Sequence, residues 1–238
     1  MPDLRVLAIA SEAREFRGIL RNCGNVVRLD WPAAFARRAE WNGNCMVCIA
    51  NGPGFQLARR AVEVASSKER FNAVVSTGFC GGLNPELQVG DIVVASSILD
   101  VRSGRRYPAS PVHTSLQVVE GTIVSQDRVA STAVDKGRLR EQFGAEAVEM
   151  EAAVVAGFAQ EENAAFYCIR TVSDRASHEF EIDLNEMRQA DGSFNKVRIL
   201  WEAIKRPRTR IGELMRLNAQ CRSAEERLGE FFANSNIA

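Results

Sequence analysis

Short apolar runs alternate with segments of helical spacing along the first three quarters of the chain. The runs that predict buried strands are Leu4–Ala10, Val26–Leu29, Cys45–Ala50, Asn72–Thr77, Gly90–Ala95, Thr122–Ser125, Ala147–Glu151 and Phe166–Asp174. The segments that predict helices are Glu12–Cys23, Phe55–Arg70, Thr132–Phe143 and Ala152–Glu162. This alternation favours an α/β fold with a mostly parallel sheet covered on both faces.

The last quarter of the chain has a different pattern. From Phe194 to Phe232 the spacing predicts two helices that are split near Pro207, as a basic extension at about 194–235 of one domain spanning 1–238. The extension has an apolar face of Leu200, Ile204, Ile211, Leu214 and Leu217 and a basic set of Lys196, Arg198, Lys205, Arg206, Arg208, Arg210, Arg216 and Arg222. Such helices can pack on the domain with a solvated basic face, or they can meet a membrane surface or an acidic partner. The pattern does not separate these two interpretations.

Composition narrows the class of protein. Apolar residues make up 46% of 238 residues, which is enough for a sizeable core, and Lys+Arg equals Asp+Glu at 30 each. The zero net charge gives no general argument for binding nucleic acid or an anionic membrane. The N-terminus has no secretory signal pattern and no run approaches a membrane span, so we expect a cytoplasmic protein.

The cysteine and histidine content predicts no metal site and no cofactor. Cys45 and Cys48 form a C-x-x-C, but this motif lies in a predicted strand, where positions i and i+3 point to opposite faces. With two histidines, His113 and His178, and no second cysteine pair, we interpret the six cysteines as reduced core residues.

Two of the predicted strands end in carboxylates. Glu149, Met150 and Glu151 follow one strand, and Asp174 ends another. A carboxylate can bind both vicinal hydroxyls of a ribose while the methionine contacts the sugar face, but acidic residues also favour a helix N-terminus. An aspartate at a buried strand end can donate a proton to a leaving group, or it can cap the next helix. Because strand ends meet at one edge of an open α/β sheet, these carboxylates can share a site.

Two further segments can reach the same edge. The cluster Gly78–Gly82 follows a predicted strand and would let backbone N–H groups approach a ligand, although a tight structural turn explains it equally well. It has neither the spacing of a phosphate-binding loop nor that of a dinucleotide fingerprint. After the first strand, Glu12, Arg14 or Glu15 could face the site, or Ser11 could cap a helix with the acids in its first turn.

Four segments together resemble the superfamily of purine nucleoside phosphorylases and methylthioadenosine/S-adenosylhomocysteine nucleosidases. They are Ser76–Leu83, Val89–Val94, Val148–Ala153 and Ile169–Asp174, and their order and spacing match over about residues 4–175. The resemblance implies a three-layer α/β/α fold with a central mixed, partly barrel-like sheet. It also implies an enzyme that cleaves the N-glycosidic bond of a purine nucleoside, works without a cofactor and assembles as a homo-oligomer.

The resemblance also assigns roles to individual residues. Asp174 matches the aspartate that protonates the purine, and Glu151 and Met150 match the residues that hold the ribose. Ser173 and Arg170 match neighbours that orient the aspartate. The positions that match the loop between base and nucleophile are Gly78, Phe79, Cys80 and Gly81, and Val129 falls where nucleosidases often carry a base-stacking phenylalanine.

The nucleophile is the point at which this chain departs from the family pattern. Nucleosidases activate water with a glutamate of an acidic run, for which the segment Glu12–Glu15 offers Glu12 and Glu15. Phosphorylases hold phosphate with an arginine, which Arg14 could supply, but their second arginine matches Ser76 and their loop serine matches Phe79. We therefore expect hydrolysis of an adenine nucleoside with a 5′ substituent, with phosphorolysis or a non-catalytic nucleoside-binding protein as alternatives.

A weaker resemblance concerns the second half of the chain. The segment Ser173–Asn185 and the basic tail are similar to the hopanoid-associated branch of the superfamily, which is thought to act on an adenosylated lipid. This resemblance implies that His178 and Phe180 line a pocket for the 5′ group and that the tail contacts a membrane peripherally.

Overall fold

The computed structural model describes residues 4–180, 185–187, 189 and 212–237. Its strands are β1 (Arg5–Ala10), β2 (Gly24–Arg28), β3 (Phe35–Trp41), β4 (Asn44–Ala50), β5 (Ala73–Gly82), β6 (Ile92–Asp100), β7 (Arg106–Pro108), β8 (His113–Thr114), β9 (Val119–Ser125), β10 (Ala147–Glu149), β11 (Ala165–Asp174) and β12 (Ser235–Asn236). Its helices are the 3-10 helix η1 (Ala13–Phe16) and the α-helices α1 (Arg17–Arg21), α2 (Phe55–Ser66), α3 (Ala133–Phe143), α4 (Ala152–Glu161) and α6 (Gly212–Ala233).

The main sheet has ten strands in the order β10-β9-β6-β11-β5-β1-β4-β3-β2, with β7 beside β6. Strand β10 also pairs with β5, so five strands close into a ring and the sheet is partly a barrel. Strand β1 is parallel to β4 and β5, whereas β11 is antiparallel to β6 and β3 is antiparallel to β4. The sheet is therefore mixed, as the family resemblance implies, and less parallel than the alternation of elements predicts.

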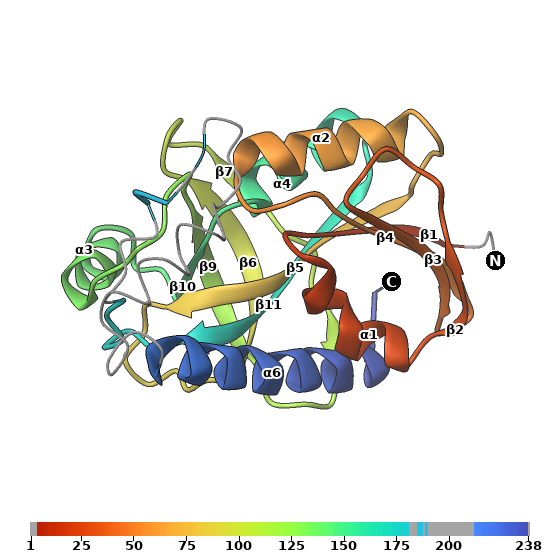
Figure 1. The fold of residues 1–238 in the computed structure, drawn as a ribbon. Helices are drawn as coiled ribbons and strands as arrows, with labels where there is room; N and C mark the ends of the chain where they lie inside the picture. Colours follow the sequence, from red (N-terminus) through yellow and green to blue (C-terminus); the bar gives the residue numbers. More distant parts are fainter. Residues whose placement is uncertain (1–3, 181–184, 188, 190–211, 238) are drawn as a thin grey trace.

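Helices cover the sheet on both faces and make three layers (Figure 1). Because neighbouring side chains of a strand point to opposite faces, Leu7 and Ile9 of β1 pack in the cluster under α2 and α4, while Val6 and Ala8 pack in the cluster that includes α1 and α6. The α/β/α architecture predicted from the sequence is confirmed.

Strand β3 and the cluster Gly78–Gly82 are among the segments of the sheet that differ from the prediction. Strand β3 was not predicted, because two of its three buried positions, Ala36 and Ala39, are small and the pair Arg37-Arg38 interrupts the alternation. The cluster Gly78–Gly82 is neither a loop nor a turn, but the second half of β5, paired with both β11 and β10.

The C-terminal helix α6 is part of the core. Leu228, Phe231 and Phe232 are fully buried, and the indole N–H of Trp41 donates to the carbonyl oxygen of Phe232 at 2.8 Å. Of the predicted basic set, Arg216 and Arg222 are exposed on this helix. For α6 the structure agrees with packing on the domain, while the first predicted tail helix lies outside the described residues.

No helix in the described part of the chain is both long enough and apolar enough to cross a membrane. The described residues likewise contain no group of three or more His, Cys, Asp or Glu that could hold a metal ion.

Candidate active site

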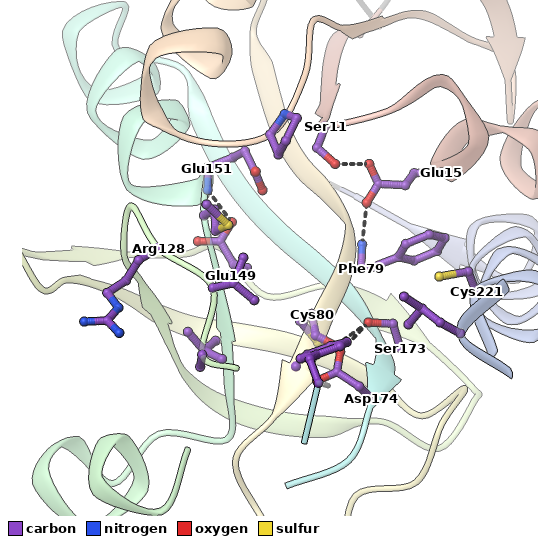
Figure 2. A pocket seen from close by; sticks show the side chains of 18 residues that line it. Ser11, Glu15, Phe79, Cys80, Arg128, Glu149, Glu151, Ser173, Asp174 and Cys221 are labelled. Atoms are coloured by element: carbon purple, nitrogen blue, oxygen red, sulfur yellow. Dashed lines mark hydrogen bonds between the residues drawn. The ribbon is translucent and has the colours of Figure 1, made fainter. Parts of the chain in front are cut away.

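A cavity of about 270 Å³ lies beyond the C-terminal ends of β1, β10 and β11 and along the glycine half of β5 (Figure 2). It is lined by Ser11, Glu15, Pro53, Phe79, Cys80, Gly81, Arg128, Val129, Ala130, Val148, Glu149, Met150, Glu151, Ser173, Asp174, Phe180, Leu217 and Cys221. The two strand-end carboxylate segments predicted from the sequence thus meet in one site.

Glu15 is the acidic residue that the segment after β1 brings into the cavity. Its carboxylate is 2% exposed and accepts hydrogen bonds from the hydroxyl of Ser11 at 2.6 Å and from the backbone N–H groups of Glu12 and Phe79, both at 2.7 Å. Burial raises the pKa of Glu15, although these hydrogen bonds and the charge of Arg170 oppose the rise. Such a carboxylate is suited to take a proton from water at neutral pH.

The glycines of β5 make room for the carboxylates. Gly78 has a φ of +122°, and a Cβ there would lie 2.3 Å from Oε1 of Glu15. A Cβ on Gly81 would lie 3.1 Å from Oδ2 of Asp174. The glycines therefore let the side chains of Glu15 and Asp174 approach the strand closely. These two side chains lie at opposite ends of the glycine stretch (Figure 2).

Arg170 holds the two glutamates that follow β10. This guanidinium is fully buried, lies 2.5 Å from Oε2 of Glu149 and 3.5 Å from Oε2 of Glu151, and also donates to the hydroxyl of Ser76 at 2.7 Å. Its charge is directed to Glu149 and Glu151, and a role of Arg170 in orienting Asp174 stays a prediction.

The two glutamates differ in what occupies their oxygens. Oε2 of Glu149 accepts the backbone N–H groups of Glu151 and Ala152, both at 2.8 Å, so this side chain secures the start of α4. In Glu151 one oxygen accepts the N–H of Gly54 at 2.8 Å, and the side chain lines the cavity beside Met150. Glu151 is thus the better placed of the two to bind a ligand.

Burial raises the pKa of Glu151 to about 8. The nearby charges of Glu149 and Glu15 also raise this pKa, whereas the charge of Arg170 and the hydrogen bond from the N–H of Gly54 lower it. Because its pKa in the folded state lies above the ordinary value of 4.5, folding favours the protonated form. The stability that this group contributes is fully present below about pH 4.5 and is lost as the pH rises through about 8.

We therefore expect the melting temperature of the wild type to fall between about pH 6 and about pH 9, and to fall less in Glu151→Gln, which cannot ionise. Thermal unfolding followed by circular dichroism at each pH measures this. Glu161→Gln, an exposed change at the end of α4, is the control and should follow the wild type. Equal falls in melting temperature in the wild type and in Glu151→Gln would contradict the raised pKa of Glu151.

Asp174 lies at the other end of the cavity and is 6% exposed. Ser173 places its hydroxyl oxygen 2.7 Å from Oδ1 of Asp174 and 3.2 Å from the carbonyl oxygen of Cys80, and its one proton can go to either acceptor. On the other side, the ammonium of Lys136 lies 2.5 Å from Oδ2 of Asp174. The carboxyl group is thus held from two sides, and the role of Ser173 in orienting it stays a prediction.

Glu12 and Arg14 do not line the cavity. Glu12 caps η1 reciprocally with Glu15. Arg14 pairs with the buried Glu225 of α6 at 2.9 Å, and its guanidinium lies 5.7 Å from the centre of the Phe79 ring. Of the three candidates after the first strand, the structure therefore brings Glu15 alone into the cavity.

The remaining predicted residues lie along the cavity or next to it. Val129 lines the cavity, and its backbone N–H and carbonyl oxygen bind the side-chain amide of Asn185 at 2.8 and 3.0 Å. Phe180 also lines the cavity, whereas His178 is not among the lining residues and packs edge-on against the Phe180 ring. Predicted positions in β5, namely Phe79, Cys80 and Gly81, lie along the cavity floor.

Lys136, Leu217 and Cys221 are among the residues of the site that were not predicted in these roles. Lys136 had a detectable signal, because it shares a face of α3 with the apolar Leu139 and Phe143 at spacings i, i+3 and i+7. Leu217 and Cys221 line the cavity from α6, a contact between distant parts of the chain that no local pattern indicates.

Comparison with known proteins gives the same fold. The model of the phosphorylase superfamily matches residues 24–115 and 109–205. A 5′-methylthioadenosine/S-adenosylhomocysteine nucleosidase from Neisseria meningitidis, in complex with methylthio-immucillin-A, is 21% identical over 95% of this chain and 97% of that chain, with a TM-score of 0.68. A putative nucleosidase of the same name from Borrelia burgdorferi B31, bound to adenine, is 16% identical over 94% and 96%, with a TM-score of 0.70. One from Helicobacter pylori is 16% identical over 97% of each chain, with a TM-score of 0.68.

Proposed function

Because the chain belongs to the phosphorylase superfamily, a family of enzymes, we propose that it hydrolyses the N-glycosidic bond of a purine nucleoside, with adenine as the base. The observation that carries the proposal is the placement of Glu15, Glu151 and Asp174 around one cavity, on three sides of the glycine half of β5. Solved nucleosidases of the same fold that hold adenine or adenosine-like ligands support the choice of base.

The three carboxyl groups suit the three parts of this reaction. As the bond breaks, the sugar gains positive charge and the base gains electron density. Asp174 gives a proton to the base, Glu151 with Met150 binds the ribose hydroxyls and the sugar face, and Glu15 takes a proton from the attacking water. Ser173 orients the acid, and Phe79 donates its backbone N–H to Glu15.

The charges around the cavity favour water over phosphate as the nucleophile. Four acidic residues line it, and Arg128 is the single cationic residue among the described lining residues. In Figure 2 the Arg128 side chain is directed away from Glu15. Arg14, the candidate phosphate ligand, is paired with Glu225 and does not line the cavity. A phosphate dianion would therefore find acidic side chains where its counter-charge is needed.

The substituent at the 5′ position belongs to the same proposal. Apart from the carboxylates, the cavity wall is largely apolar, with Phe79 from β5, Val129, Phe180, and Leu217 of α6. Such a wall favours an apolar 5′ group over a charged one. An adenosylated lipid, as the resemblance to the hopanoid-associated branch suggests, is one nucleoside of this kind.

We expect adenine to be released from adenosine or methylthioadenosine at the same rate with and without phosphate, together with a free sugar. Chromatography of base and sugar products measures both. Release that requires phosphate and yields a sugar phosphate would overturn hydrolysis in favour of phosphorolysis. Binding of these nucleosides without release of base, also when the 5′ group is bulky and apolar, would establish a non-catalytic binding protein instead.

A further inference from the structure

Lys136 is a buried cation to which the proposed reaction gives no role. It projects from α3, and its side chain is 1% exposed. Its ammonium lies 2.5 Å from Oδ2 of Asp174, 2.7 Å from the carbonyl oxygen of Arg175 and 3.3 Å from that of His178. An ammonium has three N–H groups, and these three acceptors can use all of them.

The charge of Lys136 requires a counter-charge. A buried ammonium is costly unless it is paired, and Asp174 is the carboxylate within reach in the described structure. The thiols of Cys80 in β5 and Cys221 in α6 also interact with the charge of Asp174. Burial raises the pKa of Cys80 well above its ordinary value and that of Cys221 to about 11, so both thiols are neutral near pH 7. Lys136 is therefore the charged group that directly contacts the carboxyl group of Asp174.

The same ammonium also fixes the chain that follows Asp174. By binding the carbonyl oxygens of Arg175 and His178, it holds the turn that carries Phe180 into the cavity wall, and its Nζ lies 5.7 Å from the centre of the Phe180 ring. One side chain thus connects α3, the end of β11 and the wall of the site.

We infer that Lys136 is a positioning residue for the glycosidic cleavage, which holds Oδ2 of Asp174 by its ammonium and so directs Oδ1, the oxygen beside Ser173, toward the base. The inference rests on the proposed function. Asp174 then takes one proton from solvent and gives it to a ring nitrogen of the base as the C1′–N bond breaks, with the bonding electrons going to the base. Asp174 returns to the carboxylate, and the attacking water gives its proton to Glu15.

The separate effects on kcat and KM test this role. In Lys136→Gln, kcat for base release should fall by about tenfold or more with a smaller change in KM, because the carboxyl is no longer held toward the base. Lys136→Arg, which keeps the charge, should recover most of the wild-type kcat. A Lys136→Gln protein with unchanged kcat, or with a change in KM alone, would overturn the inference. If Lys136→Gln does not fold, Lys136→Met, which is of similar length and uncharged, takes its place.

Thermal unfolding tests the same pair without turnover. In Lys136→Gln, Asp174 is buried without a cation, so the melting temperature should fall. Removing the charge of Asp174 as well, in the double variant Lys136→Gln/Asp174→Asn, should restore part of the loss, because no unpaired buried charge remains. Losses that simply add in the double variant would show that the two side chains are not coupled and would overturn the inference. This comparison stands even if the wild type releases no base, an outcome that would sink the proposed function only.

Discussion

Replacing Asp174 by Asn should lower kcat for base release by about 10²–10⁴-fold, or roughly 3–5 kcal/mol in the barrier. Asn fills the same space and its amide oxygen can still accept from Lys136, but it has no proton to give to the base at the moment the bond breaks. The effect should therefore appear in kcat more than in KM, because binding of the base needs hydrogen bonds rather than proton transfer. Steady-state release of adenine from the preferred nucleoside measures it.

The control for this variant lies one residue before Lys136. Asp135→Asn makes the same chemical change on α3, outside the residues that line the cavity, and should leave kcat within about twofold of wild type. Circular dichroism should give the same spectrum for Asp174→Asn and wild type. Near-normal turnover in a folded Asp174→Asn protein would remove Asp174 from the role of acid.

The carboxylates at strand ends could be predicted from the sequence because local pattern decides them. A buried apolar run followed by Glu149-Met150-Glu151 or ending in Asp174 places acidic groups at one edge of the sheet. The choice between Glu149 and Glu151 could not be predicted, since it depends on the turn into α4, whose backbone N–H groups take the carboxylate of Glu149.

The rest of the site depends on contacts between distant residues. The sequence suggests that Arg14 is available to bind phosphate. In the fold, α6 places Glu225, which lies 211 positions later in the chain, beside Arg14. Arg170 and Asp174 are four residues apart on β11, yet their charges serve different partners, Glu149 for one and Lys136 for the other. Single-sequence patterns report periodicity and capping, and they carry no information on which buried charges pair across the core.

The second large effect is expected at the opposite end of the cavity, where Glu15→Gln should also lower kcat by about 10²–10⁴-fold. An amide cannot take the proton of the attacking water. It also has one acceptor oxygen for the three donors that now meet the carboxylate, from Ser11, Glu12 and Phe79, so its NH₂ group must face at least one of them. The variant should therefore lose some thermal stability as well, and circular dichroism should establish that it is folded before its turnover is measured.

Glu12→Gln is the matched comparison, because Glu12 belongs to the same segment but lies outside the cavity lining. It should keep kcat within about twofold of wild type, since its amide oxygen can still accept at the start of η1. The opposite result, with turnover lost in Glu12→Gln and kept in a folded Glu15→Gln protein, would transfer the role of base to Glu12. Loss of turnover in Glu15→Gln alone would support Glu15 as the group that activates water. The backbone N–H of Phe79 holds its carboxylate at the cavity, at a distance of 2.7 Å.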